Sequence, residues 1–320
     1  MEKSSKKSPL IVRIVEIVIP LFVIIVGVWI LDFLDYPIIE VIIFGTIEAS
    51  VYALLAFGFS LVYGVGGILN LSHGAFYLMA GYILFWTFNI TGIIGGSIIS
   101  LVLITLIGGV AYLLLIRPLQ ENQVAVLIMT FSLGFFFENF IKVFGDTIPH
   151  AVPSIFGTLS FDILGVSFPA QFFLILIGAL IVVVITGLVI NKTKLGKSIR
   201  AVSQDREAAM LMGINADRVL MYTVMISAFL AGMAAILYVP ASSVATFMGW
   251  DVLSTSFAIV IFGGLGSLKG SIVGAFILGY TRNIVNYFIN PAFSAIVPIV
   301  VIVLVLLIRP RGLFGKKEIY

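Results

Sequence analysis

Long apolar runs fill most of this chain, and the breaks between them are short and carry polar residues, glycine or proline. A helix needs roughly 20 apolar residues to cross about 30 Å of hydrocarbon. The pattern therefore predicts an all-α fold, a polytopic helical membrane protein whose residues 1–320 form a single transmembrane domain. About ten membrane segments are expected: 10–31, 38–64, 74–90, 93–116, 124–144, 170–190, 219–240, 252–264, 270–289 and 292–308.

For three of these segments the sequence allows more than one relation to the membrane. Segment 10–31 follows a lysine-rich leader, but no small-x-small cleavage site comes after it, so we expect an uncleaved first span. Segments 74–90 and 252–264 are short for a complete crossing and are flanked by glycine. They either span fully or are broken or re-entrant helices, which lipid permits only where protein or a water-filled cavity covers the free backbone groups.

Composition agrees with the membrane assignment and excludes several other classes. Hydrophobic residues make up 61% of the chain and charged residues 10%, whereas soluble domains carry about 25% charged residues. The absence of cysteine excludes disulfides, thiolate metal sites and cysteine nucleophiles. With two histidines besides, the chain is a poor candidate for an intramembrane enzyme. We expect no catalytic residue, metal or cofactor, and a net charge of +3 indicates no nucleic acid partner.

The basic residues are distributed asymmetrically along the chain. If the N-terminus is cytoplasmic and each segment crosses once, 16 of the 18 basic residues fall on the cytoplasmic side. The positive-inside rule predicts this asymmetry, so both termini are expected in the cytoplasm. The residues concerned are Lys3, Lys6, Lys7, Arg13, Arg117, Lys192, Lys194, Lys197, Arg200, Arg206, Arg218, Lys269, Arg309, Arg311, Lys316 and Lys317.

The longest cytoplasmic loop, 191–218, is charged and contains a short helical pattern. Ser203 or Asp205 can cap a helix that ends near Met212, and Gly213 suits a left-handed helix end. Such a helix presents apolar residues on one side and charged residues on the other. The loop is either a solvated connection or a handle through which a soluble partner moves the membrane helices.

Within that loop, Glu207, Ala208 and Ala209, followed by Gly213, resemble the EAA signature of ABC importer permeases. In that family this coupling helix docks into a cleft of the ATPase subunit. The signature's later Ile and Leu-Pro positions are absent here. The resemblance implies that these four residues couple the chain to an ATPase.

Motifs along residues 45–315 extend the resemblance. They include Asn70-Leu71-Ser72-His73-Gly74, Arg117-Pro118-Leu119, Gly196-Lys197-Ser198, Phe262-Gly263-Gly264-Leu265-Gly266-Ser267 and Arg309-Pro310-Arg311-Gly312-Leu313-Phe314-Gly315. In this order they are similar to the permease subunits of branched-chain amino-acid ABC importers, and the Asn-Leu-Ser-His-Gly stretch is closer to the shorter of the two paired permeases.

This resemblance implies a set of partners and a substrate class. The partners are two ABC ATPase subunits, a second related permease, an external solute-binding protein and the lipid of the cell membrane. The chain has no Gly-x-x-x-x-Gly-Lys-Ser/Thr phosphate loop, so separate subunits must hydrolyse ATP. The implied substrates are leucine, isoleucine and valine; related permeases carry urea, short amides or sugars.

Two charged residues lie inside predicted membrane segments, where burying a charge in lipid is unfavourable. Glu48 lies within 38–64, where a carboxylate costs about 2.5–3.5 kcal/mol at the bilayer centre; it either lines the pathway or reaches headgroups at the outer interface. Arg282 either attracts a substrate carboxylate or snorkels to outer headgroups, and we expect it to snorkel. An ion-coupled secondary carrier is the alternative function class, although such carriers usually pair ionisable residues at mid-membrane.

Two glycine-flanked stretches are further candidates for the pathway or its gate. Asn70, Ser72 and His73 precede a helix whose free N–H groups could receive a carboxylate. Charge placement puts them near the cytoplasmic side, where they form an inner gate or a packing turn, and His73 is expected to be a hydrogen-bonded structural residue. Gly263 and Gly264 lie between two apolar segments and would allow close helix packing.

Overall fold

The computed structural model describes residues 38–144, 148–163 and 166–315. The expected first segment 10–31 with its basic leader, and Lys316 and Lys317, lie outside the described residues. The elements are α2 (Ile38–Gly66), α3 (His73–Ala111), the π-helical η1 (Tyr112–Ile116), the 3-10 helix η2 (Arg117–Leu119), α4 (Gln123–Phe144), β1 (Ser160–Ile163), β2 (Val166–Pro169), α5 (Ala170–Lys192), α6 (Lys194–Gln204), α7 (Arg206–Leu211), α8 (Ala216–Tyr238), the 3-10 helix η3 (Val239–Ala241), α9 (Met248–Gly263), α10 (Leu268–Phe288), α11 (Pro291–Ser294) and α12 (Val297–Ile308).

Every expected membrane segment from 38–64 onward coincides with a helix or a pair of helices. The all-α polytopic fold is therefore confirmed. The count of ten crossings and the cytoplasmic placement of both termini stay predictions. Within the described ranges, six helical stretches are long and apolar enough to cross a membrane: Ile39–Gly66, His73–Leu119, Gln123–Phe144, Ala170–Lys192, Ala216–Ala241 and Pro291–Ile308.

The longest of these stretches is folded back on itself at a glycine. Gly92 has φ +73° inside α3, a conformation that glycine adopts at little cost. The Ser100 hydroxyl donates a hydrogen bond to the Ala80 carbonyl at 2.7 Å, although residues twenty apart in a straight helix would be about 30 Å apart. The two limbs of α3 therefore run side by side, which matches the predicted break between 74–90 and 93–116.

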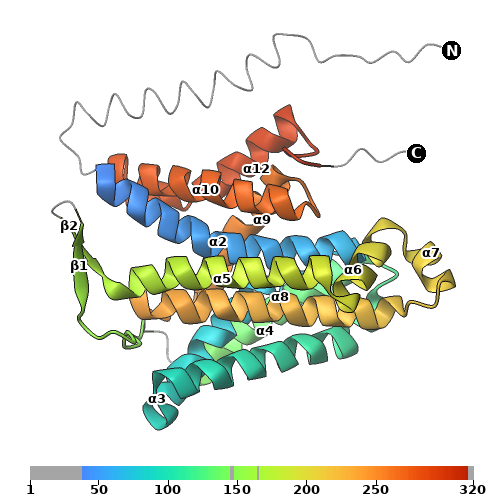
Figure 1. Cartoon of the computed structure of the whole chain (residues 1–320), viewed down its shortest axis with the longest axis horizontal. Helices are drawn as coiled ribbons and strands as arrows, with labels where there is room; N and C mark the ends of the chain where they lie inside the picture. The colour runs from blue at the N-terminus through green and yellow to red at the C-terminus, as the bar shows by residue number, and fades with distance from the viewer. Residues whose placement is uncertain (1–37, 145–147, 164–165, 316–320) are drawn as a thin grey trace.

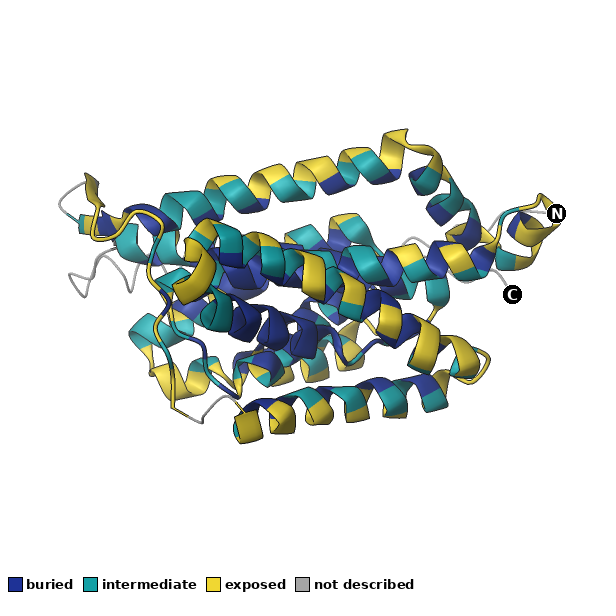
Figure 2. Ribbon diagram, turned by 90° about the horizontal axis from the view of Figure 1, so that it is seen from below, coloured by how far each residue is buried: buried dark blue, intermediate teal, exposed yellow. Residues whose placement is uncertain are grey.

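Burial divides the helices into a central and a peripheral set (Figure 2). α2 and α8 are mostly buried, whereas few residues of α5 and α12 are buried. The exposed side chains are large and apolar, for example Ile181 on α5 and Leu307 on α12. Contiguous apolar surface of this extent is unfavourable in water and suits lipid. The chain is a multi-pass integral membrane protein, with α2 packed between α8 and α10 at its centre.

The two ends of the bundle differ in structure and in charge. β1 and β2 pair antiparallel, with Ser160 opposite Pro169, and this hairpin lies at one end (Figure 1). α6 and α7 lie at the opposite end. Arg117 and Arg206, both expected on the cytoplasmic side, meet there on the carboxylate of Asp217. The α6–α7 end is called the inner end below and the hairpin end the outer end, following the charge pattern.

Candidate functional site

Two helices begin inside the bundle rather than at its ends. Residues 67–72 lead from the end of α2 back into the bundle, where the Leu71 N–H donates to the Thr130 hydroxyl of α4 at 3.1 Å. α9 begins at a similar level, because Trp250 in its first turn packs against Phe131 and Phe135 of α4. Since α4 runs from Gln123 to Phe144, α3 and α9 both start near the middle of that span. This supports the broken-helix alternative for 74–90 and 252–264.

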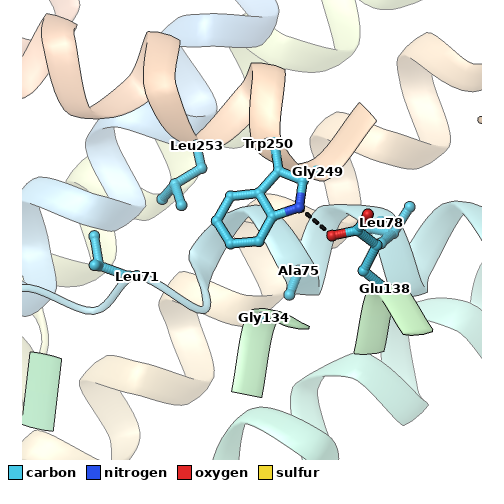
Figure 3. A pocket seen from close by; sticks show the side chains of 8 residues that line it. All are labelled: Leu71, Ala75, Leu78, Gly134, Glu138, Gly249, Trp250 and Leu253. Atoms are coloured by element: carbon cyan, nitrogen blue, oxygen red, sulfur yellow. Dashed lines mark hydrogen bonds between the residues drawn. The ribbon is translucent and has the colours of Figure 1, made fainter. Parts of the chain in front are cut away.

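Close backbone contact and one buried acid hold the two helix beginnings together. A Cβ on Gly74 would overlap the Gly249 carbonyl oxygen, so position 74 requires glycine. A Cβ on Gly249 would lie 3.0 Å from the Gly74 carbonyl oxygen, which leaves little room for a larger side chain. The Trp250 indole N–H donates to Glu138 of α4, around a pocket of about 10 Å³ (Figure 3). Lys142 lies 2.6 Å from the other oxygen of that carboxylate, so the buried charge of Glu138 is paired.

A polar cavity of about 150 Å³ lies in the outer half of the bundle. It is bounded by α2, the start of α3, the end of α8 and the beginning of α9, with α10 completing the wall. Its lining residues are Glu48, Val51, Tyr52, Tyr77, Tyr238, Ser242, Ser243, Met248, Asp251, Val252 and Arg282. Glu48, a sequence-predicted candidate, therefore faces a cavity and not headgroups.

The charge at the centre of this outer cavity is Arg282. Its Nη1 donates to the Tyr52 and Thr255 hydroxyls, each at 2.6 Å, and its Nη2 lies 3.1 Å from Asp251 Oδ1. The Arg282 side chain is only 11% exposed and that of Asp251 is 46% exposed. The expectation that Arg282 snorkels was wrong, because three oxygen partners inside the bundle hold the guanidinium there.

A larger cavity of about 560 Å³ lies at the inner end. The end of α2, α6, the Leu265–Leu268 stretch and residues 310–315 enclose it, and Arg200 and Arg311 give it positive charge. The predicted candidates Gly263 and Gly264 sit beside this cavity and do not line it. They hold the C-terminal segment, because the Phe314 N–H donates to the Gly263 carbonyl at 3.0 Å and Gly264 has φ +100°.

A packed layer separates the two cavities along α2. Tyr52 lines the outer cavity and Ser60 lines the inner one, and residues 53–59 between them are all buried. The helix rises about 12 Å from Tyr52 to Ser60. His73 fills this layer: its Nδ1 lies 3.0 Å from the Ser227 hydroxyl of α8, and its ring stands edge-on to Phe59. His73 is thus a buried, hydrogen-bonded residue of the barrier, deeper in the bundle than its predicted place near the cytoplasmic side.

Asn70 and Ser72 shape the turn that precedes His73. The Asn70 carboxamide oxygen accepts hydrogen bonds from the Ser72 hydroxyl at 2.6 Å and from the Ser72 N–H at 3.2 Å. These bonds occupy part of the helix start that the sequence offered to a solute carboxylate. The structure therefore supports the packing-turn alternative for these residues and does not bring them together with Glu48.

The predicted short helix in loop 191–218 is confirmed as α7. Asp205 caps it by accepting from the Ala208 N–H at 2.9 Å, and Gly213 ends the turn with φ +83°. Ala209 is buried against the bundle, whereas Glu207 and Ala208 are exposed.

The tip of α7 presents apolar side chains to solvent. Leu211 is 89% exposed and Met212 83% exposed. At the other end of α7, Arg206 lies 3.1 Å from Asp217, which is in the first turn of α8. The same Asp217 carboxylate lies 3.5 Å from Arg117. The short helix is thus fixed to the membrane helices at one side and free at the other (Figure 1).

Several residues of the outer cavity cannot be recognised from the sequence pattern. Tyr52, Tyr77 and Tyr238 converge on the outer cavity from three helices, and an isolated tyrosine in an apolar segment gives no signal of its orientation. Asp251 falls between the predicted segments 219–240 and 252–264, and the structure places it in the first turn of α9, inside the bundle. The sequence indicates this position only in that Asp251 directly precedes the short predicted segment 252–264.

Comparison with known proteins places these features in a family. The family profile described as "Branched-chain amino acid transport system / permease component" matches residues 41–306. The permease protein LivH of Salmonella typhimurium, from a high-affinity branched-chain amino acid transport system, is 28% identical over 86% of this chain and 94% of its own. BraD of Pseudomonas aeruginosa, a permease protein of the same description, is 27% identical over 89% and 98%.

More distant similarity extends to a second kind of permease and to one solved structure. LivM of Salmonella typhimurium is 26% identical over 82% of this chain and 67% of its own. The structure of PsaBC from Streptococcus pneumoniae in complex with Fab covers 88% of this chain and 95% of its own, with 16% identity and a TM-score of 0.49. That structural likeness is too weak to carry a conclusion.

Proposed function

The chain belongs to the family of permease components of branched-chain amino acid transport systems, and on that premise we propose that it forms part of the membrane pathway of an ATP-driven, binding-protein-dependent importer of leucine, isoleucine and valine. The observation that carries the proposal is the arrangement along α2: a polar cavity in the outer half, a larger cavity at the inner end and a packed layer between them. A solute held in one cavity reaches the other only when that layer rearranges, as alternating access requires.

The energy for that rearrangement enters through α7. Glu207, Ala208, Ala209 and Gly213 lie on a capped helix whose apolar tip is exposed at the inner end. An ATPase that grips this tip moves α7, and Asp217 passes the movement to α8 and to the α3–α4 connection through Arg206 and Arg117. Residues 1–320 act as one permease domain, with loop 191–218 as its coupling loop.

The partners follow from this division of labour. Two ABC ATPase subunits hydrolyse ATP, since this chain carries no phosphate loop, and an external solute-binding protein delivers the substrate. LivH and LivM both resemble this chain, which supports pairing with a second, related permease in the cell membrane. Sugars are the competing substrate class: the fructose import permease protein FruF of Bifidobacterium longum is 36% identical over 44% of this chain.

Co-purification tests the assembly. The chain should be co-expressed with the ATPases, permease and binding protein encoded beside its gene, and purified through a tag on this chain. We expect both ATPases and the second permease to co-purify, and the liganded binding protein to stimulate ATP hydrolysis. ATPases that are expressed and soluble but do not co-purify would contradict the coupling role of α7.

A further inference from the structure

The outer cavity contains an acid that makes no direct contact with a basic group among the described residues, although Arg282 in the same cavity attracts its charge. Glu48 has no hydrogen-bond or ion-pair partner among the described residues, although it lines the cavity beside a buried arginine. It lies one turn before Tyr52 on α2, so the two side chains share a face. Tyr52 accepts a hydrogen bond from Arg282. A carboxylate kept unpaired in a membrane protein is costly, which points to a cationic ligand.

Arg282, in the same cavity, is paired with Asp251, an acid that a solute carboxylate could replace. Two of the contacts of Arg282, to Tyr52 and Thr255, are neutral hydroxyls on buried residues. The third partner, Asp251, is half-exposed and lies at the start of α9. A carboxylate from a solute would meet the same Nη2 group that Asp251 now contacts, with the geometry that arginine offers to carboxylates.

The remaining wall combines apolar side chains with the hydroxyl-bearing residues Tyr238, Ser242 and Ser243. Val51, Met248 and Val252 line the cavity together with the ring of Tyr77. The cavity therefore offers an acceptor for a cation, a donor set for an anion and a hydrophobic surface within about 150 Å³. These three features are the parts of an aliphatic α-amino acid: ammonium, carboxylate and side chain.

We propose that the outer cavity is the recognition site for the zwitterionic backbone of the transported amino acid, in which Glu48 receives the α-ammonium group, Arg282 receives the α-carboxylate, and Asp251 occupies Arg282 when no solute is bound. The proposal rests on the proposed importer function and names the residues that select its substrate. It also separates an amino acid from sugars and urea, because a neutral solute would leave the charge of Glu48 unpaired.

Conservative variants of these residues, assayed in the complete importer in proteoliposomes, test the proposal. Glu48→Gln keeps the shape of the side chain and breaks no protein contact. We expect leucine uptake to fall at least about tenfold, the effect of losing one hydrogen bond to a charged group, while ATP hydrolysis stimulated by the binding protein persists. Glu40→Gln, on the same helix but outside the cavity lining, is the matched control and should transport normally.

A double variant tests the anion side. Arg282→Gln with Asp251→Asn removes the ion pair without leaving either charge alone, and should also lower leucine uptake at least about tenfold. If the double variant fails to assemble, Glu48→Gln decides the matter. Wild-type uptake in Glu48→Gln overturns this proposal alone. An unmodified importer that carries no leucine refutes the proposed substrate itself, and transport of a neutral sugar or urea in its place overturns both.

Discussion

Truncating the exposed apolar side chains at the tip of α7 should weaken binding of the ATPase without lowering the stability of the permease. Leu211 and Met212 are 89% and 83% exposed in this chain, so neither contributes to its own core. If an ATPase cleft covers them, each side chain is worth about 1.5–3 kcal/mol on full burial. The Leu211→Ala, Met212→Ala double variant keeps a methyl group at both positions. It should therefore lose about 2–4 kcal/mol of docking free energy, which is about 30- to 700-fold in Kd at 1.4 kcal/mol per tenfold.

The assay is the affinity of the purified ATPase for this permease in lipid nanodiscs, measured by biolayer interferometry. The thermal unfolding midpoint of the variant should match that of the unmodified protein, because the lost groups are exposed. Leu307→Ala with Ile308→Ala is the matched control: it removes a similar apolar area, also exposed, from α12 on the lipid-facing surface. An ATPase affinity unchanged within twofold, or lowered equally by the control, would refute the assignment of α7.

Three further predictions concern the helix junction and the coupling loop. Gly249→Val should destabilise the protein by about 1–3 kcal/mol, seen as a lower unfolding midpoint in nanodiscs, whereas Gly187→Val, with open space around it, should leave the midpoint unchanged or raise it. Trp250→Phe removes the indole donor to Glu138 and should cost about 1.5–3 kcal/mol, measured in the same way; an unchanged midpoint would mean that Glu138 does not anchor α9. Gly213→Pro should abolish ATP-driven uptake without loss of folded protein, because proline cannot adopt φ +83°; normal uptake would exclude a coupling role for this turn.

The sequence predicted the helices well where a single physical signal determines them. Apolar length determines the spans, because a helix must be long enough to cross the hydrocarbon. The break between 74–90 and 93–116 and the short helix capped by Ser203 or Asp205 depend on local backbone chemistry, and the structure assigns them to Gly92 and Asp205. The grouping of basic residues at the α7 end likewise reflects a one-dimensional rule.

The two cavities could not be predicted from the sequence, and the reason is also physical. Helices such as α2 are apolar all round, so the pattern does not say which face meets which neighbour. Glu48 could be suspected because it is charged, but its convergence with Arg282 and Asp251 depends on helix rotation and on where α9 begins. The error about Arg282 has the same origin: a cation near a helix end snorkels unless partners inside the bundle hold it.

The most direct test of ATP-driven import is accumulation of labelled leucine in proteoliposomes that contain the complete importer, with and without ATP inside. We expect uptake that requires internal ATP and the binding protein and that an ionophore does not change. Uptake that persists without ATP and collapses when the ionophore is added would contradict ATP-driven import and identify an ion-coupled carrier.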